Sequence, residues 1–188
     1  MGNLVTMDDL SNEDIVAVLD DAERLVPVAK GEIILPLLQG KVLANMFFEN
    51  STRTRMSFET AMKRLGGSVL NFSSVGTSVS KGETLYDTMQ MISGYADVAA
   101  IRHPRQGAAQ YSSDAVGIPI LNAGDGAGNH PTQTMLDLFT IRQAHESLDG
   151  LNVVLVGDLR YGRTAHSLSH ALVRFGASLT LVSPTSLK

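Results

Sequence analysis

The feature that most constrains the fold is the alternation of short apolar runs with amphipathic segments along most of the chain. The apolar runs predict buried strands, and the segments between them, with apolar residues every three or four positions, predict helices. The run LNVVLVGD is apolar at almost every position, which is typical of a strand covered on both faces. We therefore predict an α/β fold: a parallel sheet with helices on both faces, joined by right-handed crossovers.

The expected elements divide the chain into two α/β units. Asp149-Gly150, just after a long helical segment, is the expected boundary, so that 1–149 forms one domain and 150–188 the first part of a second. Strands are expected at 42–48, 68–72, 98–101, 118–122, 151–158 and 177–182, and helices at 11–30, 52–65, 83–95, 106–116, from 130 onward and at 163–175.

Composition narrows the class of protein. The 188 residues are 44% hydrophobic and 18% charged, as in a folded globular protein, and the net charge of −4 creates no general attraction for nucleic acid. The chain has no cysteine, which excludes disulfides and thiolate sites and fits a reducing compartment. No apolar run approaches the ~20 residues of a membrane span, and the acidic start lacks the features of a signal peptide. We expect a cytoplasmic protein without a nucleic-acid or membrane partner.

The most unusual local feature is the run Ser51-Thr52-Arg53-Thr54-Arg55, placed between an apolar strand and the start of a helix. A helix N-terminus offers free N–H groups and a positive dipole end, and an arginine fork can hold two phosphate oxygens. The alternative is an ordinary cap followed by solvated arginines. We favour the anion site, because basic residues near an N-terminus oppose the dipole unless an anion offsets them.

Further polar residues follow the other strands, at the edge of the sheet where ligands bind in open α/β folds. Arg102 comes directly after a strand, and ligand contact and surface charge are equally good interpretations. We expect His103 to be structural or exposed to solvent. His130 and Gln133 open a helix at the same edge, where spacing alone slightly favours a capping histidine and a solvated glutamine over ligand contacts.

Two other segments are ambiguous by themselves. GDLRYGRT, residues 157–164, resembles a P-loop in spacing, but Arg163 stands in the lysine position and bulky residues fill the loop. Nucleotide hydrolysis is therefore disfavoured, although Arg163 could still clamp a carboxylate. Lys81 lies in a Ser/Thr/Gly-rich loop expected at 73–82 and matters only if that loop reaches a ligand.

Together, five segments resemble the carbamoyltransferase family, specifically the catalytic chains of its aspartate form. They occur in the family's order and cover nearly the whole chain from residue 40 onward. They are FFENSTRTRMSFETAMKRLGG, SVSKGETLYDT, RHPRQGAA, NAGDGAGNHPTQTMLDLFTI and GDLRYGRTAHSL.

The resemblance implies transfer of a carbamoyl group from carbamoyl phosphate to L-aspartate, in pyrimidine biosynthesis, with no cofactor and no metal. It assigns catalytic contacts to Arg53, Thr54, Arg102 and His130. By the same resemblance, Ser51, Thr52, Arg53, Thr54 and Arg102 hold the phosphate, Thr54, Arg102 and His130 face the carbonyl oxygen, Gln133 meets the carbamoyl amide, and Arg163 binds an aspartate carboxylate.

The resemblance also implies a homotrimer with active sites shared between subunits, and regulatory chains are a further candidate partner. Lys81 would arrive from a neighbouring subunit and touch both phosphate and aspartate. Thr77 stands where the family usually has a phosphate-binding serine, with Ser78 beside it as the alternative. Glu49 resembles a residue that links the two domains.

The chain ends at Lys188, well before family members do, and we expect it alone to bind carbamoyl phosphate but to be impaired in turnover. Two alternatives stay open: a non-catalytic carbamoyl phosphate-binding or assembly module, and an ornithine-type carbamoyltransferase.

Overall fold

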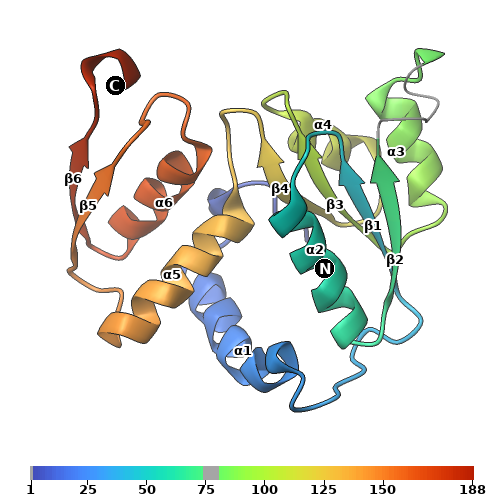
Figure 1. Ribbon diagram of the computed structural model, residues 1–188, viewed down its shortest axis with the longest axis horizontal. Helices are drawn as coiled ribbons and strands as arrows, with labels where there is room; N and C mark the ends of the chain where they lie inside the picture. Colours follow the sequence, from blue (N-terminus) through green and yellow to red (C-terminus); the bar gives the residue numbers. More distant parts are fainter. Residues whose placement is uncertain (1, 74–80) are drawn as a thin grey trace.

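The computed structural model describes residues 2–73 and 81–188, and within these it contains one four-stranded and one two-stranded parallel sheet. The larger sheet has the order β2-β1-β3-β4, and in the smaller one β5 pairs with β6 (Figure 1). The predicted α/β class is confirmed. The strands are β1 (Val42–Phe47), β2 (Ser68–Ser73), β3 (Val98–His103), β4 (Ile120–Asp125), β5 (Asn152–Val156) and β6 (Ser178–Val182).

Helices cover both faces of the larger sheet. Successive residues of a strand point to opposite faces, and on β1 each of two neighbouring residues packs against a helix. Leu43 on β1 packs with Met62 of α2, whereas the next residue, Ala44, packs with Met89 of α3 and Ala109 of α4. The helices are α1 (Asn12–Lys30), α2 (Thr52–Arg64), α3 (Leu85–Ser93), α4 (Ala108–Ala115), α5 (Pro131–His145) and α6 (Arg163–Arg174), with short 3-10 turns at Met7–Asp9 and Thr185–Leu187.

A separate core packs against the smaller sheet. It is formed by α1, α5 and α6, with Leu138 of α5 and Leu172 of α6 fully buried within it. Figure 1 shows α5 running between the sheets. The N-terminal segment adds polar links on both sides: Leu4 bridges to β4, and Arg174 of α6 donates to the Met7 carbonyl oxygen at 2.8 Å. These contacts tie the C-terminal end of α6 to the segment that pairs with the larger sheet.

Most predicted boundaries lie within two residues of the observed ones, but β4 differs more. The strand was expected at 118–122 and instead runs from Ile120 to Asp125, so the expectation that residue 123 begins a loop is wrong. The reason is a register irregularity in β3, beyond which His103 pairs with Asp125 and lengthens both strands. The loop expected at 73–82 falls mostly outside the described residues.

None of the helices in the described ranges combines the length and the apolar character that a bilayer-spanning helix needs.

Candidate active site

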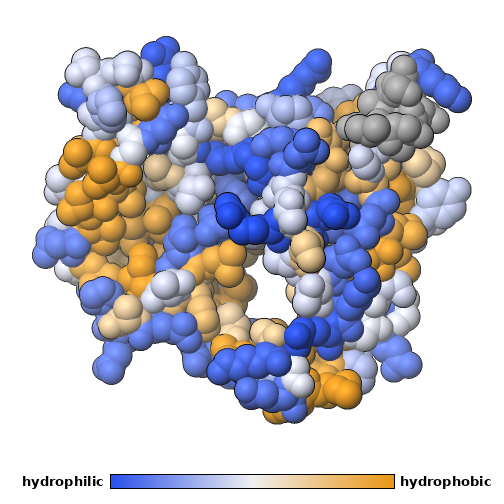
Figure 2. All heavy atoms as spheres, viewed as in Figure 1, coloured by the Kyte–Doolittle hydropathy of each residue, from blue (hydrophilic) through white to orange (hydrophobic). Residues whose placement is uncertain are grey.

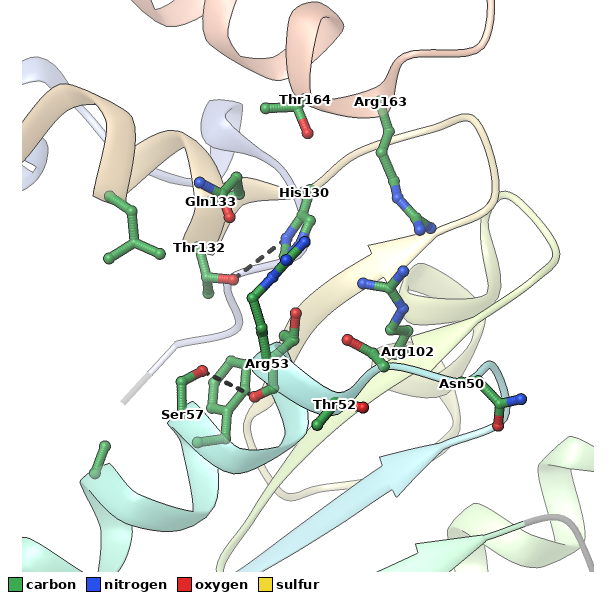
Figure 3. Close-up of a pocket in the computed structure, with 15 residues that line it drawn as sticks. Asn50, Thr52, Arg53, Ser57, Arg102, His130, Thr132, Gln133, Arg163 and Thr164 are labelled. Carbon is green, nitrogen blue, oxygen red and sulfur yellow. Dashed lines mark hydrogen bonds between the residues drawn. The ribbon is translucent and has the colours of Figure 1, made fainter. Parts of the chain in front are cut away.

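A cleft of about 880 Å³ lies beyond the carboxyl ends of β1, β3 and β4, between the larger sheet and α6. Hydrophilic residues gather in this hollow between the two sheets (Figure 2), and Figure 3 shows their side chains converging from several elements. The residues that line the cleft are Asn50, Ser51, Thr52, Arg53, Thr54, Ser57, Phe58, Ala61, Arg102, His130, Thr132, Gln133, Leu136, Arg163 and Thr164.

Three helices, α2, α5 and α6, direct their N-terminal residues into the cleft. Among the described residues, the N-cap positions Ser51, His130 and Gly162 make no side-chain capping hydrogen bond, and the first turns of these helices carry no acidic residue. By contrast, α1 and α3 are capped by Ser11 and Thr84 in the usual way. Uncapped N-termini leave N–H groups and positive dipole ends available, so the cleft is suited to an anion.

Two arginines of the cleft share one carboxylate. Arg102 Nη2 lies 2.9 Å from Glu49 Oε1, and Arg163 Nη2 lies 3.1 Å from the same oxygen. The arginine side chains are mostly buried, at 13% and 16% exposed, while Glu49 is 33% exposed. Partial burial acts to raise the pKa of Glu49, but the hydrogen bonds from Arg163 and Arg102 outweigh it and hold the pKa below its ordinary value. Glu49 therefore stays ionised and keeps both guanidinium groups at the cleft.

Arg163 reaches this position because Gly124 leaves room for it. A Cβ atom added at Gly124 would lie 3.1 Å from the Arg163 Cζ atom, and the backbone φ of 116° is one that side chains rarely permit. The glycine at the end of β4 thus allows the guanidinium group to lie against the strand.

His130 is a neutral imidazole at the centre of the cleft wall. It is only 6% exposed, and burial together with the charges of Arg102 and Arg163 lowers its pKa to about 4. Its backbone N–H donates to Ser167 Oγ at 3.0 Å, and the Ser167 hydroxyl donates to the Arg163 carbonyl oxygen. This pair of hydrogen bonds ties the start of α5 to the start of α6.

The loop before His130 is organised by a buried carboxylate, Asp125, which is 3% exposed. Its two oxygens accept hydrogen bonds from the backbone N–H groups of Gly107 and Asn129, both at 2.8 Å, and from Asn122 Nδ2 at 3.2 Å. Asp125, at the end of β4, therefore joins the start of α4 to the residue that precedes His130.

The cleft brings together most of the residues that the sequence predicted. Eight of them line it: Ser51, Thr52, Arg53, Thr54, Arg102, His130, Gln133 and Arg163. Lys81 is exposed and does not line the cleft of its own chain, and Thr77 lies outside the described residues. His103 is half-buried against Phe48 and accepts a hydrogen bond from the Arg105 N–H, which agrees with its expected structural role.

Sequence reasoning missed Thr132, Thr164 and Asp125. Thr132 Oγ1 lies 3.4 Å from His130 Nδ1, and Thr164 follows Arg163 in the first turn of α6. Both threonines sit inside motifs already singled out, so their place in the first helical turn was the available signal. Asp125 had no such signal, because its role depends on how the chain around it folds and on Gly107, 18 residues away.

The segment 157–164 does not form a phosphate-binding P-loop. Asp158 Oδ1 accepts the backbone N–H groups of Arg160 and Tyr161, at 3.0 and 2.9 Å, which a P-loop would offer to phosphate. Within residues 2–73 and 81–188, no three histidine, aspartate or glutamate side chains lie close enough together to hold a metal ion.

The chain is similar to known carbamoyltransferases. The family model described as aspartate/ornithine carbamoyltransferase, carbamoyl-P binding domain, matches residues 3–143. The aspartate carbamoyltransferase catalytic subunit of Methanococcoides burtonii is 56% identical over 187 residues, which is 99% of this chain and 60% of that protein. The subunit of Archaeoglobus fulgidus is 53% identical over 188 residues, or 100% of this chain and 63% of that protein.

Solved structures agree with this similarity. The Trypanosoma cruzi aspartate transcarbamoylase in complex with carbamoyl phosphate and aspartate has a TM-score of 0.95 at 44% identity, over 99% of this chain and 59% of that one. The catalytic subunit of the M. jannaschii enzyme has a TM-score of 0.92 at 49% identity, over 100% of this chain and 62% of that one. The chain thus spans about three fifths of the length of the relatives that it matches.

Proposed function

Because the chain belongs to the aspartate/ornithine carbamoyltransferase family, we propose that it transfers the carbamoyl group of carbamoyl phosphate to the amine of L-aspartate. The products are N-carbamoyl-L-aspartate and phosphate, in pyrimidine biosynthesis. The observation that carries the proposal is a single cleft lined by the 51–54 run together with Arg102, His130 and Arg163.

The phosphate of the substrate binds at the N-terminus of α2. Ser51, Thr52 and Thr54 supply hydroxyl donors, the first turn supplies backbone N–H groups, and Arg53 and Arg102 supply positive charge. The absence of a capping side chain on this described helix supports the assignment, because the free N–H groups need an acceptor.

The carbonyl oxygen of the carbamoyl group faces Thr54, Arg102 and His130. Negative charge develops on this oxygen when the amine attacks, and donors already directed at it stabilise that charge. The low pKa of His130 supports a neutral imidazole there. Its ring N–H can donate a hydrogen bond to the carbonyl oxygen without any change in the protonation state of the ring. Removing one such donor typically costs ~2.7–4 kcal/mol of activation free energy.

Bond making and breaking need no group beyond the two substrates. The aspartate nitrogen forms a bond to the carbonyl carbon, the bond between that carbon and the phosphate oxygen breaks, and the leaving phosphate takes the amine proton. Arg163 holds an aspartate carboxylate and so places the amine next to the carbonyl carbon. Juxtaposing two substrates in this way can contribute roughly 7–11 kcal/mol.

The wider organisation of the protein is proposed on the same family basis. Residues 1–149 form the carbamoyl phosphate domain and 150–188 begin the aspartate domain, matching the division into two sheets. The active unit is a cytoplasmic homotrimer in which Lys81 reaches the cleft of a neighbouring subunit, and regulatory chains are a candidate further partner. The exposed position of Lys81, away from its own cleft, is compatible with this arrangement.

Calorimetric titration with carbamoyl phosphate tests the phosphate site. Arg53→Ala is expected to weaken binding by about tenfold or more, because it removes a charge-assisted contact of the cleft. Arg55→Ala is the matched control: Arg55 is an exposed arginine of the same helical turn that does not line the cleft. Equal losses in both variants would show that general positive charge, rather than this site, binds the anion.

Product assays with aspartate and with ornithine test the acceptor. Carbamoyl transfer to aspartate is expected at an impaired rate, with Arg163→Ala raising the KM for aspartate more than the KM for carbamoyl phosphate. Transfer to ornithine in place of aspartate would assign the chain to the other branch of its family.

A further inference from the structure

Gln133 and Asp137 form a pair one turn apart on α5. Gln133 lines the cleft, and its Nε2 atom donates to Asp137 Oδ1 at 3.0 Å. Asp137 does not line the cleft itself and is half-buried. The pair therefore connects a residue in the cleft with a carboxylate behind it.

The hydrogen bond to Asp137 decides which end of the Gln133 carboxamide faces the ligand. A carboxamide has an N–H2 end that only donates and an oxygen end that only accepts, whereas an ionised carboxylate only accepts. With Nε2 bound to Asp137, Oε1 is the end left for the cleft. Figure 3 shows the amide oxygen of Gln133 on the side of Arg53 and its nitrogen turned away. Within the described residues, no donor pairs with that oxygen.

A hydrogen-bond acceptor in this place distinguishes acyl phosphates by the substituent on the carbonyl carbon of their acyl group. A carbamoyl group presents an N–H2 that can donate to Gln133 Oε1, whereas an acetyl group of nearly the same size presents a methyl group. A site that is built to pair with a donor disfavours the analogue that lacks it, because its own acceptor then stays unpaired.

We propose that Asp137 is a positioning residue that fixes the Gln133 oxygen toward the cleft and so makes the site select carbamoyl over other acyl phosphates. This inference rests on the proposed function, since it assumes that the cleft holds an acyl phosphate. It goes further by assigning the choice of acyl group to a carboxylate that does not touch the ligand.

The test is the ratio of the dissociation constants for acetyl phosphate and carbamoyl phosphate, measured by calorimetry. Asp137→Ala is expected to lower this ratio about three- to tenfold, the worth of one hydrogen bond, by weakening carbamoyl phosphate binding alone. Asp137→Asn keeps the volume of the side chain but can donate as well as accept, so the ratio is expected to fall part of the way.

The chain offers a matched control in Asp114, which accepts a hydrogen bond from Gln110 Nε2 at 2.8 Å with the same spacing on α4, outside the cleft. Asp114→Ala is expected to leave the ratio unchanged. A general loss of structure in an Asp137 variant would weaken both ligands equally and leave the ratio as it is.

The outcomes separate the two levels of the argument. If the unmodified chain binds carbamoyl phosphate in preference to acetyl phosphate but both Asp137 variants keep that preference, the positioning role is refuted and the proposed function stands. If the unmodified chain binds neither acyl phosphate, the proposed function fails and the inference fails with it.

Discussion

The neutral state of His130 makes the stability of the folded chain depend on pH in a definite direction. The pKa of His130 lies at about 4 in the folded protein, against an ordinary value of 6.5. Between these two values the unfolded chain binds a proton at this residue and the folded chain does not. Stability therefore rises with pH across this window and is lost as the pH falls from about 6.5 toward 4.

The size of the effect follows from the two pKa values. Each pH unit between 4 and 6.5 contributes ~1.36 kcal/mol, which gives about 3 kcal/mol in total. This is a large part of the ~5–15 kcal/mol that stabilises a typical domain. The cause lies in the structure: His130 is 6% exposed and faces the charges of Arg102 and Arg163, so a proton there is both desolvated and repelled.

Urea denaturation of the wild type and of His130→Gln, at about pH 7.5 and about pH 4.5, measures this contribution. Other groups also titrate in this range, so the informative quantity is the difference between the two proteins in stability lost. The variant is expected to lose about 2–3 kcal/mol less than the wild type. His145→Gln, at the exposed C-terminal end of the same helix, should behave like the wild type. Equal losses in the wild type and in His130→Gln would refute the argument.

Three further predictions concern the groups around His130. Glu49→Gln removes the carboxylate that pairs with both arginines and should tighten inorganic phosphate binding about three- to tenfold by calorimetry; weaker binding would contradict this. Asp125→Ala leaves three donors without their acceptor and should cost about 3 kcal/mol or more in urea unfolding, so a cost below about 1 kcal/mol would be evidence against its role. Gly124→Ala should displace Arg163 and raise the pKa of Glu49 toward its ordinary value in an NMR titration, whereas Gly150→Ala, with open space around it, should leave that pKa as it is.

The fold and the location of the site were predictable because they depend on patterns that are local in the sequence. Apolar runs and helical periodicity identified the strands and helices, and parallel strands place their carboxyl ends on one edge. Ser51 and His130 each follow a strand and Arg102 lies near the carboxyl end of one, so one edge had to collect them. The exception was β4, whose extension to Asp125 depends on an irregularity in its neighbour that no pattern within 118–125 announces.

The electrostatic state of the site could not be predicted in the same way. The two partners of Glu49 lie 53 and 114 residues away in the sequence, and their convergence depends on how α6 is placed against the larger sheet. Spacing alone favoured a capping role for His130, whereas the structure shows no capping hydrogen bond from its side chain. The decisive property, its low pKa, comes from burial and from two arginines of other elements. Roles assigned to Thr77 and Lys81 remain predictions.

The same two arginines set two properties of the cleft that the proposed reaction needs together. Their charges favour an anion in the cleft, and they add to the effect of burial in keeping His130 neutral, because a further positive charge beside them is unfavourable. Glu49 pairs with both arginines before a ligand arrives, so a bound phosphate competes with this carboxylate for the same guanidinium groups. It follows that replacing Arg102 acts twice: it removes a proposed phosphate contact and lets the pKa of His130 rise. A loss of activity in such a variant therefore cannot be assigned to phosphate binding alone unless the pKa of His130 is measured in the same protein.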